Sequence, residues 1–231
     1  MTGKAEAVRT MFTRIAARYD LMNSLMTGGR HHAWRRVAAA AVAMAPPGLA
    51  LDLATGTGDL ALAVRAARPA HGVVGADFSE AMLRHARVKL RARRAELVPL
   101  LAADALGLPF RDATFACVTS AFLLRNLADL AAGLAEMARV TVRGGLVAAL
   151  EITRPGLPGW DALFGLYFNR VVPLIGALVA RDRAAYTYLP QSVERFVTPA
   201  GLAQLMTRAG LRNVHYRRLG LGTIALHVGT A

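Results

Sequence analysis

Short apolar runs alternate with helical stretches along most of this 231-residue sequence, and this alternation limits the possible folds more than any other feature. We expect strands over residues 49–54, 71–77, 96–102, 114–122 and 145–152, with helices between them. Right-handed crossovers through helices bring such strands together as an open parallel sheet. The sequence therefore predicts an α/β fold: a Rossmann-like, doubly wound sheet with helices on both faces and ligands at the carboxyl ends of its strands.

The two ends of the chain extend this core. Further helices are expected over residues 4–18, 33–45 and 198–210. The closing segments "NVHYRRL" and "TIALHVG" read as strands, and we expect the last strand to run antiparallel to its neighbours. The predicted sheet is therefore mostly, but not entirely, parallel.

One aromatic segment does not follow this alternation. Residues 156–196 are rich in aromatic side chains, with seven of the 15 in the chain, and are interrupted by Pro173 and Pro190. We predict a single domain over residues 1–231, with a helical N-terminal segment at 1–45 and a helical lid insertion at 156–196. A plain helical cover of the core is the alternative reading of the insertion.

The composition is that of a globular chain. It is 55% hydrophobic and 19% charged. No run of about 18 apolar residues is free of charges, because the best candidate, "LFGLYFNRVVPLIGALVARD", contains Arg170 and Pro173. The N-terminus has no apolar signal region, and the lone Cys117 excludes an internal disulfide. We therefore expect a cytoplasmic protein.

The formal net charge of +13 favours anionic partners such as nucleic acid or an anionic membrane surface. Only Lys4 and Lys89 are lysines, so nearly all of the 28 basic side chains are Arg. The densest basic stretch, "RVKLRARR" at residues 87–94, reads as the outer face and end of a helix. A solvated basic face is therefore the alternative to a binding surface.

The turn after the first strand, "LDLATGTGDLALAV", carries the first sign of chemistry. Gly56 and Gly58 let the strand turn sharply into a helix and let a ligand approach the backbone closely. The stretch "GTGDLA" fits the dinucleotide pattern G-x-G-x-x-A, so an NAD-dependent oxidoreductase has to be considered. Asp77, at the end of the second strand, is placed to accept hydrogen bonds from ribose hydroxyls of either NAD or S-adenosylmethionine.

Two further positions favour S-adenosylmethionine over NAD. Asp52 lies within the first strand, where a carboxylate suits the ammonium group of S-adenosylmethionine but would repel a pyrophosphate. Asp104 and Ala105 follow the third strand. Asp104 can accept a hydrogen bond from an adenine amino group, and Ala105 leaves room for the flat ring.

Several longer segments share their pattern with one known family. They are "YDLMNSLMTGGRHHAW", "AFLLRNLAD", "RVTVRGGLVAALEIT", "YFNRVVPLIG", "AYTYLPQSV" and "ALHVG". On these segments the chain resembles the class I S-adenosylmethionine-dependent methyltransferases, and within them the family that C-methylates quinone precursors in menaquinone and ubiquinone biosynthesis. The chain departs from the family pattern at Thr55, where Gly is usual, and at Ala121, where Ser is usual.

The resemblance implies S-adenosylmethionine as the cofactor. No metal ion is required for such a reaction, and the sequence shows no Cys/His cluster that would suggest one. The residues expected to bind the cofactor are Asp52, Gly56, Thr57, Gly58, Asp77, Asp104, Ala105 and Ala121.

The resemblance also implies methylation of an aromatic carbon in a prenylated quinol, with demethylmenaquinol the first candidate. Such a carbon attacks well only when its neighbouring hydroxyl is ionised, so a base or a cation beside that hydroxyl lowers the barrier. We expect Arg125 to favour the phenolate and Asn126 to orient it or a water. Tyr19, Asp20 and His31 are expected to close the pocket, with His31 the natural base by its pKa. Roles at helix ends are the alternative for Asp20 and His31.

Two alternatives to the quinol methyltransferase stay open. One is a methyltransferase for another small phenolic molecule or for RNA, and the other is an NAD-binding oxidoreductase or a non-catalytic ligand-binding domain. We predict a prenylated quinol as substrate, no nucleic acid partner, and peripheral contact of residues 156–196 with an anionic membrane at its inner face. A homodimer is left open.

Overall fold

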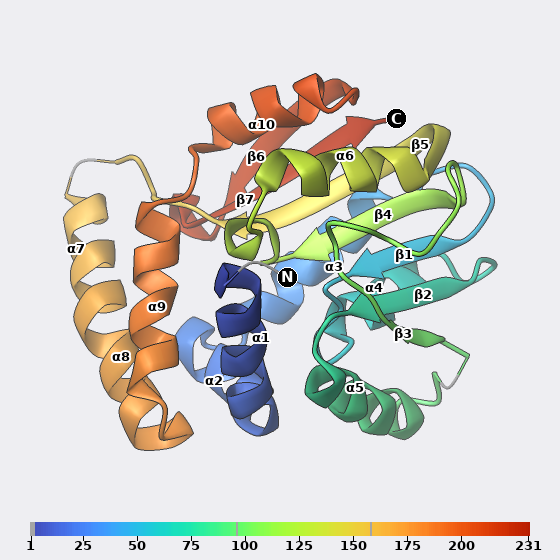
Figure 1. Ribbon diagram of the computed structural model, residues 1–231. Coiled ribbons are helices and arrows are strands. Elements are labelled where there is room, and N and C mark those ends of the chain that lie inside the picture. Colours follow the sequence, from blue (N-terminus) through green and yellow to red (C-terminus); the bar gives the residue numbers. More distant parts are fainter. Residues whose placement is uncertain (1–2, 96, 158) are drawn as a thin grey trace.

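The computed structural model describes residues 3–95, 97–157 and 159–231. Its centre is a seven-stranded sheet in the order β3-β2-β1-β4-β5-β7-β6 (Figure 1). The strands are β1 (Ala50–Leu53), β2 (Val73–Asp77), β3 (Leu100–Ala102), β4 (Phe115–Ala121), β5 (Thr141–Ile152), β6 (Arg212–Leu219) and β7 (Ile224–Thr230). Neighbouring strands are parallel except at β7, which runs antiparallel to β5 and β6. The predicted mostly parallel sheet with an antiparallel last strand is confirmed.

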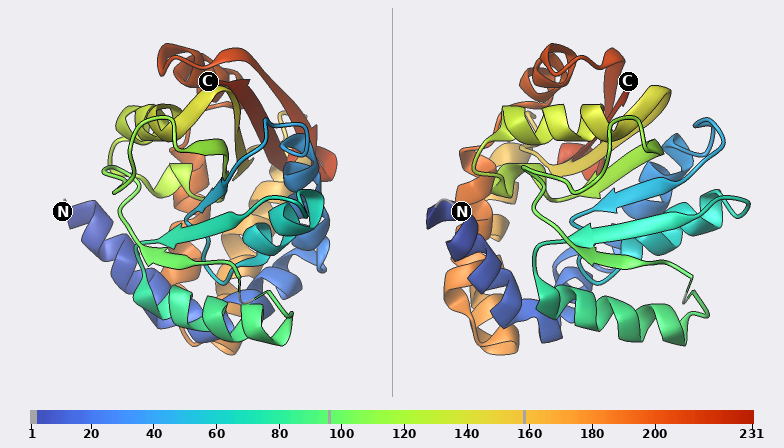
Figure 2. Two further views of the ribbon diagram at one scale, coloured as in Figure 1. Left: turned by 90° about the vertical axis from the view of Figure 1, so that its right-hand side faces the viewer. Right: turned by 45° about the vertical axis from the view of Figure 1, so that its right-hand side comes forward.

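Helices cover both faces of the sheet (Figure 2). They are α1 (Gly3–Ile15), α2 (Tyr19–Thr27), α3 (Arg30–Ala41), α4 (Asp59–Ala67), α5 (Glu80–Ala92), α6 (Leu130–Val140), α7 (Trp160–Leu166), α8 (Val172–Ile175), α9 (Arg183–Glu194) and α10 (Pro199–Arg208). Side chains of α3 and α4 pack on one face, and those of α6 and α10 pack on the other. Successive strand residues point to opposite faces, so Ala50 joins the first layer and Leu51 the second.

The strand order determines where a ligand site can lie in this sheet. The chain runs from β1 outward to β2 and β3, and then returns to the other side of β1 as β4. The carboxyl ends of β1 and β4 therefore flank the point where the order reverses, which is where open α/β sheets bind ligands.

The N-terminal segment differs from the prediction. In place of one helix over 4–18 and another over 33–45, the structure has α1, a short 3-10 turn, α2 and α3. Gly28 has a φ of 56° and Gly29 a φ of 75°, and this left-handed pair separates α2 from α3. The polar stretch 19–36 is thus mostly helical, because it buries its polar members His31 and Arg35 against each other.

The lid segment is more continuous than predicted. Trp160–Ala180 forms one helix, in which π-helical turns at Tyr167–Val171 and Gly176–Ala180 flank α8. The prediction that Pro173 interrupts this segment is wrong, because Pro173 lies in the first turn of α8, directly after a π-turn, where a missing N–H is tolerated. Pro190 likewise lies inside α9.

The lid packs on the N-terminal helices (Figure 1). A third apolar cluster joins α1 and α2 to the lid, and its members include Met11, Ile15, Met22, Phe168, Val172 and Tyr186. The outer face of the lid helix has no such cover among the described residues. Over an 18-residue window this helix has a mean hydropathy of 1.7 and only 22% of its residues are buried, so by length and composition alone it could cross a membrane. Its exposed leucines are Leu163, Leu166, Leu174 and Leu178.

Arg68 holds the connection between α3 and β1. Its guanidinium is buried and donates to the carbonyls of Val42 (3.1 Å), Ala45 (2.9 Å) and Pro46 (2.7 Å). These carbonyls follow the end of α3, where backbone acceptors lack helical partners.

We expect Arg68→Met to lower the free energy of unfolding by about 1–3 kcal/mol, because buried carbonyls lose their donors. Arg87→Met, at an exposed position on α5, is the matched control and should have little effect. Urea denaturation followed by circular dichroism measures both. Equal stability of the two variants would contradict this role.

Candidate active site

The first cavity lies at the turn after β1, and we call it the turn cavity. Five of the predicted cofactor residues line it: Gly56, Asp77, Asp104, Ala105 and Ala121. They come from the carboxyl ends of four neighbouring strands, as the strand order requires. Helix α1 covers the cavity through Ala5, Val8 and Phe12.

Asp77 is the most firmly fixed polar group in the turn cavity. Its Oδ2 accepts a hydrogen bond from the Gly56 N–H (2.8 Å), and its Oδ1 accepts one from the Ser79 N–H (2.8 Å). Gly56 has a φ of 57°, and a Cβ at this position would lie 3.9 Å from the Tyr19 ring, inside the cavity. Burial raises the pKa of Asp77 to about 6, although these two backbone donors oppose the rise.

Three other predicted cofactor residues do not reach the cavity. Both carboxylate oxygens of Asp52 accept hydrogen bonds from threonines, Thr55 at 2.7 Å and Thr119 at 3.1 Å. Burial raises the pKa of Asp52 to about 7. Thr57 bonds to other side chains, and Gly58, with a φ of 89°, begins α4. These three residues therefore stabilise the sharp turn between β1 and α4. The hydrogen bonds of Asp52 and Thr57 hold it together, and the positive φ of Gly58 lets the chain change direction.

The second cavity lies between the N-terminal helices and the lid, and we call it the lid cavity. Its volume is about 510 Å³, within the range usual for ligand sites. It is lined largely by aromatic side chains, which include Trp34, Phe122, Trp160, Phe164, Tyr167 and Tyr188. Phe12, Tyr19, Phe122 and Asn126 line both cavities, so the two spaces share one wall.

Arg125 lines the lid cavity and belongs to a buried ion pair. Its Nη1 lies 2.9 Å from Oε2 of Glu151 and donates to the Phe122 carbonyl at 2.8 Å. The Nε of Arg125 is buried and has no hydrogen-bond partner among the described residues. The second oxygen of Glu151 accepts the Leu124 N–H at 2.6 Å. Glu151 thus fixes the turn after β4 as well as the guanidinium.

Asn126 and Phe122 complete this shared wall. Asn126 donates to the Phe122 carbonyl at 3.0 Å and accepts a hydrogen bond from the Tyr188 hydroxyl at 3.1 Å. Phe122 has a φ of 65°, which is strained for an aromatic residue. This conformation aims its carbonyl at both Arg125 and Asn126, so the strain serves the geometry of the wall.

Of the residues expected to close the pocket, His31 lines the lid cavity and Asp20 does not. Asp20 lines neither cavity and instead accepts a hydrogen bond from Thr57 (2.6 Å) and pairs with Lys89 (2.5 Å). His31 lines the lid cavity, but its Nδ1 accepts from Arg35 and its Nε2 lies 3.2 Å from the Ser24 hydroxyl. Burial, helped by the charge of Arg35, lowers the pKa of His31 to about 4. A group with so low a pKa is a weak base at neutral pH, so burial disfavours His31 as the base, and its role stays a prediction.

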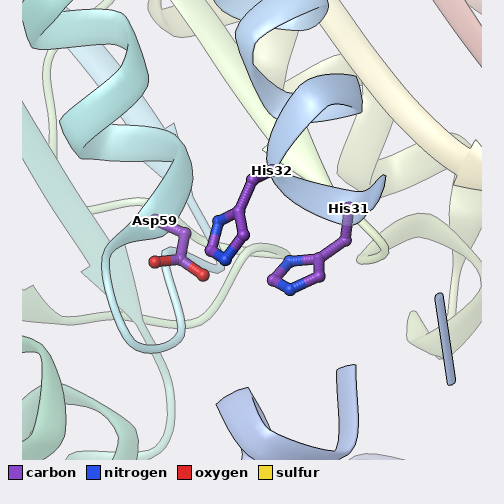
Figure 3. A group of neighbouring side chains, drawn as sticks. All are labelled: His31, His32 and Asp59. Carbon is purple, nitrogen blue, oxygen red and sulfur yellow. The ribbon is translucent and has the colours of Figure 1, made fainter. Parts of the chain in front are cut away.

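The structure also brings together a group that the sequence did not reveal. His31 and His32 begin α3, Asp59 begins α4, and their ligand atoms lie within 4.8 Å of one another (Figure 3). Two cations already contact this group, since Arg35 bonds to His31 and Lys89 bonds to Asp59 at 2.8 Å. The local positive charge disfavours a divalent ion there.

Glu151 is the functional residue that sequence reasoning left without a role. The signal was present, because a carboxylate near the end of the apolar strand "GLVAALEI" has to find a buried partner. The role of Tyr188 was harder to predict from the sequence, because its hydrogen-bond partner Asn126 lies on an element that is distant in the sequence.

Comparison with known proteins agrees with this geometry. The model of the ubiE/COQ5 methyltransferase family matches residues 1–231. A demethylmenaquinone methyltransferase of Roseiflexus sp. (strain RS-1) is 46% identical over 98% of this chain and 94% of that protein. One from Thermus thermophilus is 46% identical over 95% of this chain and 99% of that protein. A ubiquinone/menaquinone biosynthesis C-methyltransferase of Desulfotalea psychrophila is 41% identical over 98% of this chain and 91% of that protein.

Solved structures share the fold at low sequence identity. A SAM-dependent methyltransferase from Aquifex aeolicus aligns with a TM-score of 0.62 and 17% identity, covering 91% of this chain and 96% of that chain. A SAM-dependent methyltransferase from Thermotoga maritima aligns with a TM-score of 0.63 and 18% identity, covering 96% and 98%. The predicted fold class is confirmed. Because the family match spans all of the chain, this protein belongs to the ubiE/COQ5 methyltransferase family, and its cofactor is S-adenosylmethionine, as predicted.

Proposed function

We propose that this enzyme methylates a ring carbon of a prenylated hydroquinone, and that demethylmenaquinol is its acceptor. The observation that carries the proposal is Arg125, which lines an apolar cavity that shares a wall with the turn cavity and whose buried Nε–H has no partner among the described residues. Higher identity to the demethylmenaquinone enzymes, 46% against 41%, favours a naphthoquinol over a benzoquinol.

The residues of the turn cavity fit S-adenosylmethionine. Asp77 would accept hydrogen bonds from the ribose hydroxyls, since each of its oxygens keeps a free lone pair. Asp104 uses one oxygen to accept the Leu106 N–H at 3.0 Å and has another for an adenine amino group. Ala105 and Ala121 leave space for flat or bulky groups. When bound, S-adenosylmethionine supplies an electrophilic methyl group on a sulfonium sulfur.

The chain itself contributes polar side chains, above all Arg125, beside the wall that the two cavities share. A hydroquinone carbon becomes a strong nucleophile when the hydroxyl beside it loses its proton. Arg125 would donate its Nε–H to that oxygen and stabilise the negative charge as it forms. Glu151 prevents the guanidinium from turning away, because it holds Nη1 on the opposite side. The carbon–carbon bond then forms as the carbon–sulfur bond breaks, and the ring loses its proton to become aromatic again.

The other predicted catalytic residues take different roles in this proposal. Asn126 and Tyr19 line both cavities and would hold the ring carbon in line with the methyl group. Asp20 would act through the turn, since it bonds to Thr57 next to Gly56. His31 would orient Arg35 and shape the cavity as a neutral ring.

The direct test is an assay of methyl acceptors. Purified enzyme with S-adenosylmethionine should methylate short-chain demethylmenaquinol in detergent, and mass spectrometry should place the added methyl on the ring carbon. Phenol and tRNA serve as acceptors for the competing functions. Methylation of tRNA, or methyl transfer to a quinol oxygen, would overturn the proposal.

The remaining partners and the location stay predictions. A prenylated acceptor resides in a bilayer, so the exposed leucines of the lid helix would meet the membrane at its inner face. A cytoplasmic location and the lack of a nucleic acid partner accompany this proposal, and a homodimer stays open.

Asp77→Asn should weaken the binding of S-adenosylhomocysteine about ten- to a hundredfold, because a charged acceptor is lost. In the native enzyme, affinity should be highest above pH 6 and fall below it, since protonation of the raised Asp77 carboxyl removes the same charge. Asp77→Asn should make the affinity for S-adenosylhomocysteine nearly independent of pH. Titration calorimetry from pH 5 to 8 measures the affinity and its pH dependence.

Asp161→Asn is the control, because the Asp161 carboxylate also accepts a backbone N–H but lines neither cavity. Unchanged affinity in Asp77→Asn would contradict the assignment of Asp77 to the ribose hydroxyls.

Arg125→Met should lower kcat about 10²- to 10³-fold while leaving cofactor affinity near normal. The single variant also leaves Glu151 buried without its cation, so it should be less stable. Adding Glu151→Met removes the unpaired charge and should restore part of the stability, although the Leu124 N–H loses its acceptor, and it should not restore turnover. Recovery of turnover in the double variant would show that the pair is only structural.

Vesicle co-sedimentation tests the membrane contact. The enzyme should bind anionic vesicles at low salt and bind them less at high salt, because screening weakens the attraction of its basic residues. Leu166→Ser with Leu174→Ser should weaken binding about tenfold or more. Leu97→Ser, which changes a leucine that is 77% exposed next to β3, is the control and should not. No binding at low salt would exclude an interfacial enzyme.

A further inference from the structure

The lid cavity holds two buried polar atoms that the mechanism above does not use. The hydroxyl of Tyr186 and the amide nitrogen of Asn23 have no hydrogen-bond partner among the described residues. Both residues line the lid cavity, although one comes from α2 and the other from α9. A buried polar group without a partner is unfavourable, so two in one cavity indicate a ligand that supplies the missing partner.

Tyr186 differs from Tyr167 and Tyr188, which line the same cavity. Tyr167 donates its hydroxyl to the Met26 carbonyl at 2.8 Å, and Tyr188 donates to Asn126 at 3.1 Å. Tyr186 is only 4% exposed, and its ring lies so close to the backbone of Gly176 that a Cβ there would meet the ring at 2.4 Å. The ring is therefore fixed by packing, and the hydroxyl cannot swing away to find water.

Both groups are hydrogen-bond donors. An amide nitrogen only donates, and burial raises the pKa of the Tyr186 hydroxyl, so it keeps its proton. Two donors on residues that line one cavity would fit an oxygen that accepts twice. A phenolic oxygen can do so, whereas an isoprenoid tail has no such atom.

The two donors come from other elements of the lid cavity than Arg125 does. Asn23 lies on α2 and Tyr186 on α9, whereas Arg125 lies in the turn after β4. A hydroquinone has two oxygens on opposite sides of its ring. If Arg125 holds the oxygen beside the methylated carbon, the other oxygen faces the far side of the lid cavity.

We propose that Asn23 and Tyr186 bind the second oxygen of the hydroquinone, and that they make the enzyme selective for 1,4-dihydroxy aromatics over single phenols. This inference rests on the function proposed above. The two residues are positioning residues, because they hold the ring in place and do not touch the reacting atoms. A missing second oxygen would leave both donors buried and unpaired, which is how polar sites reject analogues.

The experiment compares two acceptors in matched variants. One acceptor is a short-chain prenylated 1,4-dihydroxynaphthalene, and the other lacks only the hydroxyl beside the prenyl-bearing carbon. We expect Tyr186→Phe and Asn23→Leu each to lower kcat/KM for the dihydroxy acceptor about tenfold. Neither should change kcat/KM for the monohydroxy acceptor. The ratio between acceptors is the readout, because their different intrinsic reactivity is the same in every variant.

Stability provides the second readout. Tyr186→Phe removes an unpaired hydroxyl, so the Tm should stay the same or rise. Tyr167→Phe is the matched control from the same cavity: it takes the donor from the Met26 carbonyl, so it should lower the Tm by about 2–4 °C without changing the ratio between acceptors.

Two results would overturn the inference. One is an equal loss of kcat/KM for both acceptors in Tyr186→Phe, which would indicate a structural role, and the other is an unchanged kcat/KM for both acceptors. The failure of the proposed function is distinguishable, because in that case the native enzyme would methylate neither acceptor at its ring carbon.

Discussion

The buried pair of Arg125 and Glu151 is the interaction on which the rest of the site depends. Glu151 is near the end of β5, and Arg125 is in the turn after β4, so the pair joins two neighbouring strands just beyond the edge of the sheet. Removing two charges from water is unfavourable unless both are well bonded. Here each charge has a second partner, the Leu124 N–H for Glu151 and the Phe122 carbonyl for Arg125. The turn is therefore held rigidly, and it forms the wall between the two cavities.

This wall explains why the remaining elements are arranged as they are. The sheet supplies the turn cavity at its reversal point, but a flat sheet edge cannot enclose an aromatic ring. Helices α1, α2 and the lid close over the edge and bury one another in a third apolar cluster. Among the described residues that line the lid cavity, Arg125 Nε, the Asn23 amide nitrogen and the Tyr186 hydroxyl are buried without a hydrogen-bond partner. A buried donor acts in surroundings of low dielectric constant, so its hydrogen bond to a ligand is stronger than the same bond in water.

Local patterns were enough to predict the sheet, the glycine turn and the family. The order of apolar runs identified all five parallel core strands, and Asp77 and Gly56 lie together as their places at strand ends required. The roles of Asp20 and His31 could not be predicted, because their partners Lys89 and Arg35 were chosen by packing between helices. Pro173 was misread because a π-turn, which has no sequence signature, accommodates it. The sequence indicated that Glu151 is a buried carboxylate, but it did not indicate that Arg125 is its partner.

The central claim is that Arg125 favours the ionised form of the acceptor. It is tested most directly by ultraviolet titration of a prenylated 1-naphthol, a single phenol that keeps the hydroxyl beside the reacting carbon, bound together with S-adenosylhomocysteine. The pKa of the bound naphthol should lie below its value in water, because a fixed cationic donor outweighs the burial of the phenolate. In Arg125→Met with Glu151→Met, the pKa of the bound naphthol should rise above the value in water. A bound pKa in the native enzyme equal to or above that in water would contradict the account.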